Sequence, residues 1–231
     1  MFEKHVDVLL KTALFRGLEK KEILAVLNCF QPRVEGFHAN ELIVISGDVF
    51  EEVGLILQGE ASVNKENAAG NRMVMTILAS GDLFGEVIAF SGQAKWPATV
   101  EAQSECQVLF LPRENIIGEC PKMCTWHGVL IHNFLRIISE RALFLNKKVE
   151  YLTIKSMRAK IATYLLEQYQ RTRERSFTLP LNRNELAEFL NVSRPSMSRE
   201  LGKMKDEGVI DYYLTSFKLL DLEALKRMSA L

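Results

Sequence analysis

The stretch LNRNELAEFLNVSRPSMSRELGKMKDEGVI, residues 181–210, decides the architecture of the C-terminal part of the chain. It begins with Asn182, followed three residues later by Glu185, which is the pattern of a capping box at a helix start. After a short turn, Ser193 can cap a second helix, whose first turn tolerates Pro195. These signals predict two helices joined by a tight turn.

The flanking residues complete a small domain. Gly208 is a helix-ending signal, and residues 210–213 and 217–220 read as the two strands of a hairpin. An amphipathic helix is expected from about Ser156, and RTRERS, residues 171–176, supplies a polar link before the first capping box. The order predicts a winged helix-turn-helix.

The start of the second helix carries more polar side chains than a helix that only covers a core. VSRPSMSRE, residues 192–200, places Arg194 and Arg199 around a single central apolar residue, Met197. In a helix-turn-helix, the N-terminal residues of the second helix enter the major groove, where arginine can donate two hydrogen bonds to guanine. A helical hairpin with merely solvated arginines is the alternative. The residues expected to contact DNA are Ser193, Arg194, Pro195, Ser196, Ser198, Arg199 and Lys203.

A long helix is expected in the middle of the chain, because the glycines nearly vanish after Pro121. An apolar seam repeats at steps of four and three residues for three heptads, the pattern of a helix that packs along a partner helix. A second apolar row, Leu130, Phe134, Ile137 and Phe144, lies beside it. One face can therefore dock on the β-roll of the same chain while another forms a homodimer along the seam. A core helix that touches only its own chain is the alternative. The seam comprises Ile131, Leu135, Ile138, Ala142, Leu145, Val149 and Leu152.

The N-terminal half has a different texture. Its first thirty residues predict short helices, and residues 31–112 hold short apolar or alternating runs separated by glycine, as in a closed all-β sandwich or barrel. The predicted fold class is thus α+β, with a β-roll, a long dimerisation helix and a winged helix-turn-helix. The corresponding domains are residues 1–122, 123–153 and 154–231.

Composition sets limits on function. Apolar residues make up 48% of the 231 residues and charged residues 25%, as in a soluble globular protein, and no apolar run approaches the roughly 18 residues that cross a bilayer. The expected location is the cytoplasm, with no membrane partner. Residues 1–150 hold 15 Lys and Arg against 19 Asp and Glu, and residues 151–231 hold 14 against 10, so the mildly basic C-terminal part suits an anionic partner. No Walker loop, Rossmann fingerprint, catalytic cluster or metal-ligand pair is present, which argues against an enzyme.

With these parts placed, the chain resembles the Crp/Fnr family of bacterial transcription regulators over nearly its full length. LIVISGDVFEEVGLILQGEASV, residues 42–63, and LASGDLFGEVIAF, residues 78–90, are similar to the family's cyclic-nucleotide-binding-type roll, and residues 181–210 to its helix-turn-helix. The resemblance implies a homodimer, a small-molecule effector bound between roll and helix, and a palindromic promoter site in double-stranded DNA. It also implies transcription activation with RNA polymerase as a partner.

The effector region departs from the members that bind cyclic AMP. Gly85 and Glu86 match the family, but Trp96 and Pro97 stand where an Arg-Ser pair would hold the cyclic phosphate. A buried phosphodiester would lack its charge partner, at a cost of several kcal/mol, so the sequence argues against cyclic AMP and leaves the effector unknown. Trp96 either forms the wall of a pocket for an apolar ligand or fills the vacated cavity. The residues expected around the effector are Gly85, Glu86, Val87, Trp96, Pro97, Thr99, Leu145 and Asn146.

The cysteines and histidines of the chain bear on two other sensing chemistries. The family's oxygen-sensing branch ligates an iron–sulfur cluster through N-terminal cysteines, whereas the first cysteine here is Cys29, so that cluster is not expected. Cys120 and Cys124 form a CxxxC without a second thiol pair, so the cysteines are expected to be buried and unreactive, with no metal site. Haem sensing stays an alternative through His5, His38, His127 and His132, as does a ligand-binding module without DNA function.

Overall fold

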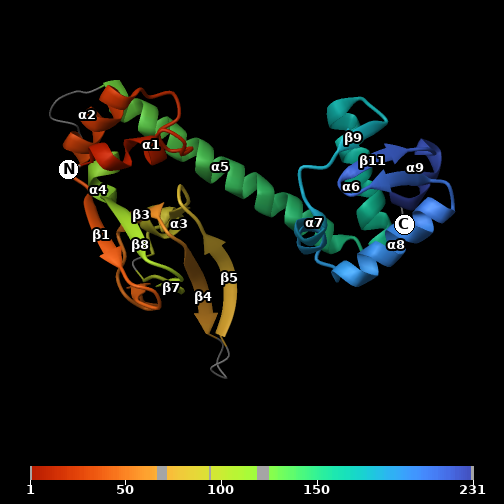
Figure 1. Cartoon of the computed structure of the whole chain (residues 1–231), viewed down its shortest axis with the longest axis horizontal. Helices are drawn as coiled ribbons and strands as arrows, with labels where there is room; N and C mark the ends of the chain where they lie inside the picture. The colour runs from red at the N-terminus through yellow and green to blue at the C-terminus, as the bar shows by residue number, and fades with distance from the viewer. Residues whose placement is uncertain (1, 67–71, 94, 119–124, 230–231) are drawn as a thin grey trace. The chain divides into compact units, whose positions relative to one another are not determined.

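The computed structural model describes residues 2–66, 72–93, 95–118 and 125–229, and it divides into two compact units, residues 1–140 and 141–231 (Figure 1). Both contain helices and antiparallel sheets, so the predicted α+β class is confirmed: a β-roll, a long helix and a helix-turn-helix follow one another. Cys120 and Cys124 lie outside the described residues. Within the part of the chain that the structure describes, no helix is long and apolar enough to span a membrane.

The first unit begins with the expected short helices. They are a 3₁₀ turn at Glu3–His5, α1 (Val6–Leu9) and α2 (Lys20–Phe30). Helix α2 starts at a capping box formed by Glu19 and Glu22, and it ends at Gln31 in the left-handed conformation. These helices supply apolar side chains that cover one face of the roll.

Two four-stranded antiparallel sheets form the roll (Figure 1). One has the order β1 (Arg33–Phe37), β8 (Cys106–Pro112), β3 (Glu52–Gln58) and β6 (Leu83–Phe84). The other has the order β2 (Leu42–Val44), β7 (Thr99–Ala102), β4 (Ala61–Glu66) and β5 (Arg72–Leu78). The all-β prediction for residues 31–112 missed helix α3 (Glu86–Phe90), and α4 (Arg113–Ile117) follows directly after this segment.

The central strands of the first sheet, β3 and β8, are buried on both faces, which explains their nearly continuous apolar sequences. Side chains alternate between faces along a strand. In β8, Leu109 and Leu111 join the core under the helices, whereas Val108 and Phe110 join the core between the sheets. Because both faces of these central strands contact apolar cores, their sequences do not alternate between polar and apolar residues.

Helix α5 (Thr125–Thr153) carries the two predicted apolar rows. From the second row, Leu130, Phe134 and Ile137 are buried in the core of the first unit. The amide of Asn133 donates to the carbonyls of Leu14 and Arg16, at 2.8 and 2.9 Å, which fixes the helix against the N-terminal segment. These three residues dock on the unit that contains the roll, as predicted, whereas Phe144 is 53% exposed and contacts Phe189 of the second unit instead.

The seam of α5 lies on another side of the helix. Ile131 and Ile138 are half-buried and Ala142 is exposed. Leu145 and Val149 are 60% and 59% exposed, and Leu135 and Leu152 are exposed as well. The core-helix alternative therefore fails for most of the seam, because these side chains do not enter the core of their own chain.

The second unit is built from α6 (Met157–Thr172), β9 (Ser176–Thr178), α7 (Arg183–Phe189), α8 (Arg194–Asp206), β10 (Ile210–Tyr213), β11 (Ser216–Leu219) and α9 (Leu222–Ser229). The expected hairpin is in fact a three-stranded antiparallel sheet of order β10, β11, β9. Two residues of the predicted polar link belong to α6, and its last residue begins β9. The third strand has too few residues for a periodic signal, so only its pairing with β11 reveals it.

The C-terminal end of α5 belongs to this second unit. The ring of Tyr151 lies 5.1 Å from that of Phe189, and Phe144 lies 5.7 Å from the same ring. Phe144 and Tyr151 are seven residues apart and continue the row that docks on the first unit. One row of α5 thus packs against each unit in turn.

Candidate nucleic-acid interface and effector region

Both helices of the helix-turn-helix begin at the predicted caps. Asn182 Oδ1 accepts from the backbone N–H groups of Asn184 and Glu185, and the Glu185 carboxylate accepts from the N–H of Asn182 at 2.7 Å. Ser193 Oγ accepts from the Ser196 N–H at 3.3 Å and donates to the Ser196 hydroxyl at 2.7 Å. Pro195 lies in the first turn of α8, where its missing N–H costs no helical hydrogen bond.

The two faces of α8 differ in chemistry. Met197, Leu201 and Met204 are fully buried in the core of the second unit. The residues predicted to contact DNA are accessible instead: Ser193, Arg194, Pro195, Ser198, Arg199 and Lys203 are exposed, and Ser196 is half-buried.

The arginines on this face keep their charge available. The Arg199 guanidinium donates to the hydroxyl of Ser196 at 3.2 Å. Among the described residues, neither Arg194 nor Arg199 forms an ion pair with a carboxylate. The face thus presents cationic donors to solvent at a helix N-terminus, a combination suited to phosphates and base edges.

Helix α6 anchors α8 from behind. Arg158 Nε lies 2.5 Å from a carboxylate oxygen of Glu200, and its two terminal nitrogens donate to Glu207 at 2.8 Å each. Glu200 and Glu207 are two turns apart, so one guanidinium fixes the rotation of α8 about its axis. The hydrogen bonds with Glu207 and Glu200 raise the pKa of Arg158.

The turn between the helices is also held by α6. Lys160 is buried, and its ammonium donates at 2.9 Å to the carbonyl of Leu190, the residue that ends α7. Asn191 then takes the left-handed conformation at φ 51°. Sequence reasoning missed Arg158 and Lys160; the signal was two bases within the expected amphipathic helix near Ser156.

A third missed base connects α7 to the wing. The Arg183 guanidinium lies 4.7 Å from the ring centre of Tyr212 and 4.8 Å from that of Phe217. Burial lowers the pKa of Arg183 below its usual value. The stack ties the start of the helix-turn-helix to β10 and β11.

The expected effector residues of the roll fall into two groups. Gly85 takes φ 86° and starts α3, where a Cβ would lie 2.4 Å from the ring of Phe50. Glu86 is fully buried at the first position of α3, and Val87 is exposed. Pro97 and Thr99 instead line a hollow of about 640 Å³.

The hollow beside Pro97 and Thr99 contains an arginine that sequence reasoning missed. Arg72 forms an ion pair with Glu101, and both side chains line the hollow. Because this guanidinium already has an anionic partner, a phosphate would have to displace the carboxylate. Arg72 was missed since it is far in sequence from the segment 85–97.

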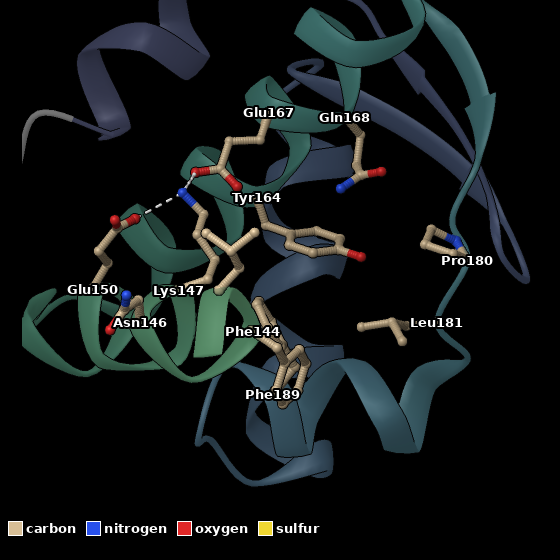
Figure 2. Close-up of a pocket in the computed structure, with 11 residues that line it drawn as sticks. Phe144, Asn146, Lys147, Glu150, Tyr164, Glu167, Gln168, Pro180, Leu181 and Phe189 are labelled. Atoms are coloured by element: carbon tan, nitrogen blue, oxygen red, sulfur yellow. Dashed lines mark hydrogen bonds and ion pairs between the residues drawn. The ribbon is translucent and has the colours of Figure 1, made fainter. Parts of the chain in front are cut away.

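Trp96 is part of the core between the sheets. It is 7% exposed, and its ring lies 5.4 Å from Phe50 and 6.4 Å from Phe84. Of the two sequence-based alternatives, this burial favours a tryptophan that fills the core. Leu145 and Asn146 are exposed residues of the second unit, where Asn146 lines a separate cavity of about 630 Å³ (Figure 2).

The histidines and the described cysteines differ in burial, and Cys29, which was expected to be buried, is only half-buried. His127 is buried with Nε2 2.6 Å from the carbonyl oxygen of Ile116, so this nitrogen donates a hydrogen bond. His5 is buried, and desolvation lowers its pKa. His38 is exposed beside Glu105, and His132 is exposed. Cys106 is buried, which raises the pKa of its thiol and disfavours the reactive thiolate.

Comparisons with known proteins match both units. A model of the cyclic nucleotide-binding domain matches residues 34–120, and a model of the Crp-like helix-turn-helix domain matches residues 159–228, together more than half of the chain. The cyclic AMP receptor protein of Thermus thermophilus is 24% identical over 197 residues, which cover 85% of this chain and 87% of that protein. The nitrogen fixation regulation protein FixK of Azorhizobium caulinodans is 24% identical over 204 residues, covering 84% and 78%.

The fold is also found among solved structures. The catabolite activator protein of Thermus thermophilus superposes with a TM-score of 0.54 at 20% identity, covering 95% of this chain and 99% of that one. At this level of identity the likeness shows the fold, and the site must be argued from the residues of this chain.

Proposed function

Because the chain belongs to the Crp/Fnr family of DNA-binding transcription regulators, we propose that it acts as a homodimeric activator whose operator affinity is set by a small-molecule effector. The observation that carries this proposal is the solvent-facing side of α8. Arg194, Ser198 and Arg199 stand there without anionic partners among the described residues. Arg158 holds this helix from behind, and Lys160 holds the turn that precedes it.

The proposed contacts divide by chemistry. Arg194 and Arg199 read base edges in the major groove, because a guanidinium can donate two hydrogen bonds to one guanine. Ser193, Ser196 and Lys203 bind phosphates, which position the helix without reading sequence. Pro195 offers only apolar contact and therefore reads its base pair less strictly.

Dimerisation supplies the second α8. The exposed seam of α5 suits a parallel pair with a second copy, and a twofold axis along it would present two recognition helices to the two halves of a palindrome. Half-sites would then be separated by about one turn of DNA, roughly 34 Å. RNA polymerase is the proposed partner of the bound dimer.

The proposed effector binds the roll near α3 and acts through α5. Gly85, Glu86 and Val87, at the start of α3, are the proposed contacts in the roll. Cyclic AMP is not proposed, because Trp96 occupies the core and Arg72 is paired with Glu101. The effector would act by favouring one arrangement of the two α8 helices over another.

The test is a titration of a promoter fragment from the protein's own upstream region. Wild-type protein should shift the fragment, with affinity falling steeply as salt rises. Arg199→Ala should weaken binding by about tenfold or more, the loss of one bidentate contact to guanine.

The matched control is Arg227→Ala, which removes an exposed arginine of the same unit from α9. It should retain the affinity of the wild type. Equal losses for both variants, or full affinity for Arg199→Ala with an intact fold, would rule out α8 as the reading helix.

A further inference from the structure

The second unit contains a cavity that the proposed DNA contacts do not use. It has a volume of about 630 Å³, within the range of small-molecule sites, and lies between α5, α6, α7 and the loop before α7. Phe144, Tyr164, Leu181 and Phe189 form much of its apolar wall. Figure 2 shows the Tyr164 hydroxyl pointing toward the side lined by Pro180 and Leu181.

The α5 side of the cavity carries excess negative charge, whereas at Gln168, another lining residue, the Arg171 guanidinium donates to the side-chain oxygen at 2.6 Å. Lys147 Nζ lies 2.8 Å from a carboxylate oxygen of Glu150 and 2.6 Å from one of Glu167, and Figure 2 shows it between the two. The hydroxyl of Tyr151 donates to the other oxygen of Glu167 at 2.9 Å. One ammonium thus faces two carboxylates, and Glu150 is exposed enough to accept a further cation.

A neighbouring hollow has the same ratio of one lysine to two glutamates. It has a volume of about 300 Å³ and shares Phe144, Leu181 and Phe189 with the cavity. Lys148 faces it together with Glu185 and Glu188, so again one lysine meets two glutamates. Aromatic walls with surplus carboxylates on both sides match a molecule that has an apolar ring and a positive head, and they repel anions.

We propose that this cavity is a ligand site of the DNA-binding unit for a small aromatic amine. The ring would lie between Phe144, Leu181 and Phe189, and the ammonium would reach Glu150. Nucleotides and other anionic effectors are poor occupants of the part lined by Phe144 and Phe189, because the surplus carboxylates there would oppose their charge. This site is separate from the proposed effector region of the roll.

The consequence of binding follows from the elements that the ligand would join. Phe144 belongs to the long helix, whereas Phe189 belongs to the first helix of the helix-turn-helix. A bound amine would stiffen their contact and shift the operator affinity; this coupling rests on the proposed function. Ligand binding itself can be measured without DNA.

Three probes share a phenyl ring and differ in the head group: 2-phenylethylamine, 2-phenylethanol and 3-phenylpropionate. Titrated into full-length protein with labelled leucine methyl groups, the amine should shift the signals of Leu143 and Leu181, with a dissociation constant on the order of 1 mM. The alcohol should bind more weakly, and the acid weakest of all. The reverse order, or shifts confined to other leucines, would overturn the proposal.

Two variants test the site, each with its own control. Leu143→Trp fills the mouth of the cavity at a position that is 69% exposed and should abolish the shift at Leu181, whereas Leu220→Trp, outside the cavity, should leave it unchanged. Glu150→Gln should weaken amine binding by about threefold, the size of an exposed charge pair, and leave the alcohol unaffected. Glu174→Gln, an exposed acid outside both hollows, should change neither probe.

The ligand site and the proposed DNA-binding function can be refuted independently of each other. If no probe shifts the leucine signals at 10 mM, or if Leu143→Trp binds the amine like the wild type, the site is refuted even when the protein binds its promoter. If the amine binds at the cavity but no promoter fragment is shifted, the site stands and the proposed function falls.

Discussion

At the scale of single residues, backbone conformation is the most demanding constraint in the roll. Gly85 starts α3 with φ 86°, in the left-handed region that side chains rarely adopt. A Cβ there would also collide with Phe50 and with the carbonyl oxygen of Glu52, at 2.4 and 2.9 Å. Gly85 is therefore needed for the shape of the roll, independently of any effector.

Gly85→Ala should lower the free energy of unfolding by roughly 2 kcal/mol, because strain and collision add. The measurement is chemical denaturation of the purified protein. Gly36→Ala is the control: its φ is not left-handed and no atom lies within 4 Å of the added Cβ, so stability should be unchanged or slightly higher. If Gly85→Ala has the free energy of unfolding of the wild type, the turn before α3 relaxes freely and the prediction is wrong.

The position of α8 depends on a second residue, Arg158, whose charge is shared by Glu200 and Glu207. Arg158→Met should cost about 1 kcal/mol of stability, speed amide exchange in α8 and reduce operator affinity without removing a DNA contact. Lys226→Met breaks only the surface pair with Glu223 and should change none of these. Unaltered exchange in α8 would show that packing alone orients the helix.

At the scale of elements, α5 and α6 meet through a buried tyrosine. Desolvation first, then the charge of Glu167 and the hydrogen bond to it, raise the pKa of Tyr151 far above 10. Burial also raises the pKa of Tyr164. Above pH 10, both phenols therefore stay protonated in the folded state, whereas in the unfolded chain they would lose their protons.

The sign of the pH effect follows from these raised pKa values. The stabilisation is complete below pH 10 and is lost as pH rises above it, since the unfolded state then gains by ionising. In an absorbance titration at 295 nm, two of the five tyrosines should resist ionisation until the protein unfolds. Tyr151→Phe should leave one resistant residue. Five tyrosines that titrate together near pH 10 would disprove this junction.

At the scale of the whole molecule, the exposed seam of α5 determines whether the protein is a dimer or a monomer in the proposed function. In a parallel pair, each seam residue meets its own copy, so Leu145→Glu would place two carboxylates together at the axis. That variant should sediment as a monomer, whereas Leu143→Glu, which changes an exposed leucine of the same helix off the seam, should stay dimeric. A wild-type protein that is monomeric at micromolar concentration would refute the dimer.

Much of the fold could be predicted because its signals are local. The capping box at Asn182, the Ser193 cap, the Gly208 stop and the row of α5 that docks on its own chain depend on residues a few positions apart, and all four are confirmed. Helix α3 and strand β9 escaped detection, because elements of five and three residues are shorter than the windows in which periodicity can be read.

Local spacing and capping signals were enough to predict the order of roll, long helix and winged helix-turn-helix, and the polar character at the start of α8. Only the tertiary structure decided that Trp96 joins the aromatic core, that Arg72 is held by Glu101, and that Arg158 and Lys160 brace α8 and its turn. The polar contacts join residues that are 29 to 49 positions apart in the sequence, and Trp96 enters a core between two sheets. Local periodicity cannot reveal such contacts, because only the folding of the chain brings these residues together. The cavity beside Phe144 and Phe189 exists for the same reason.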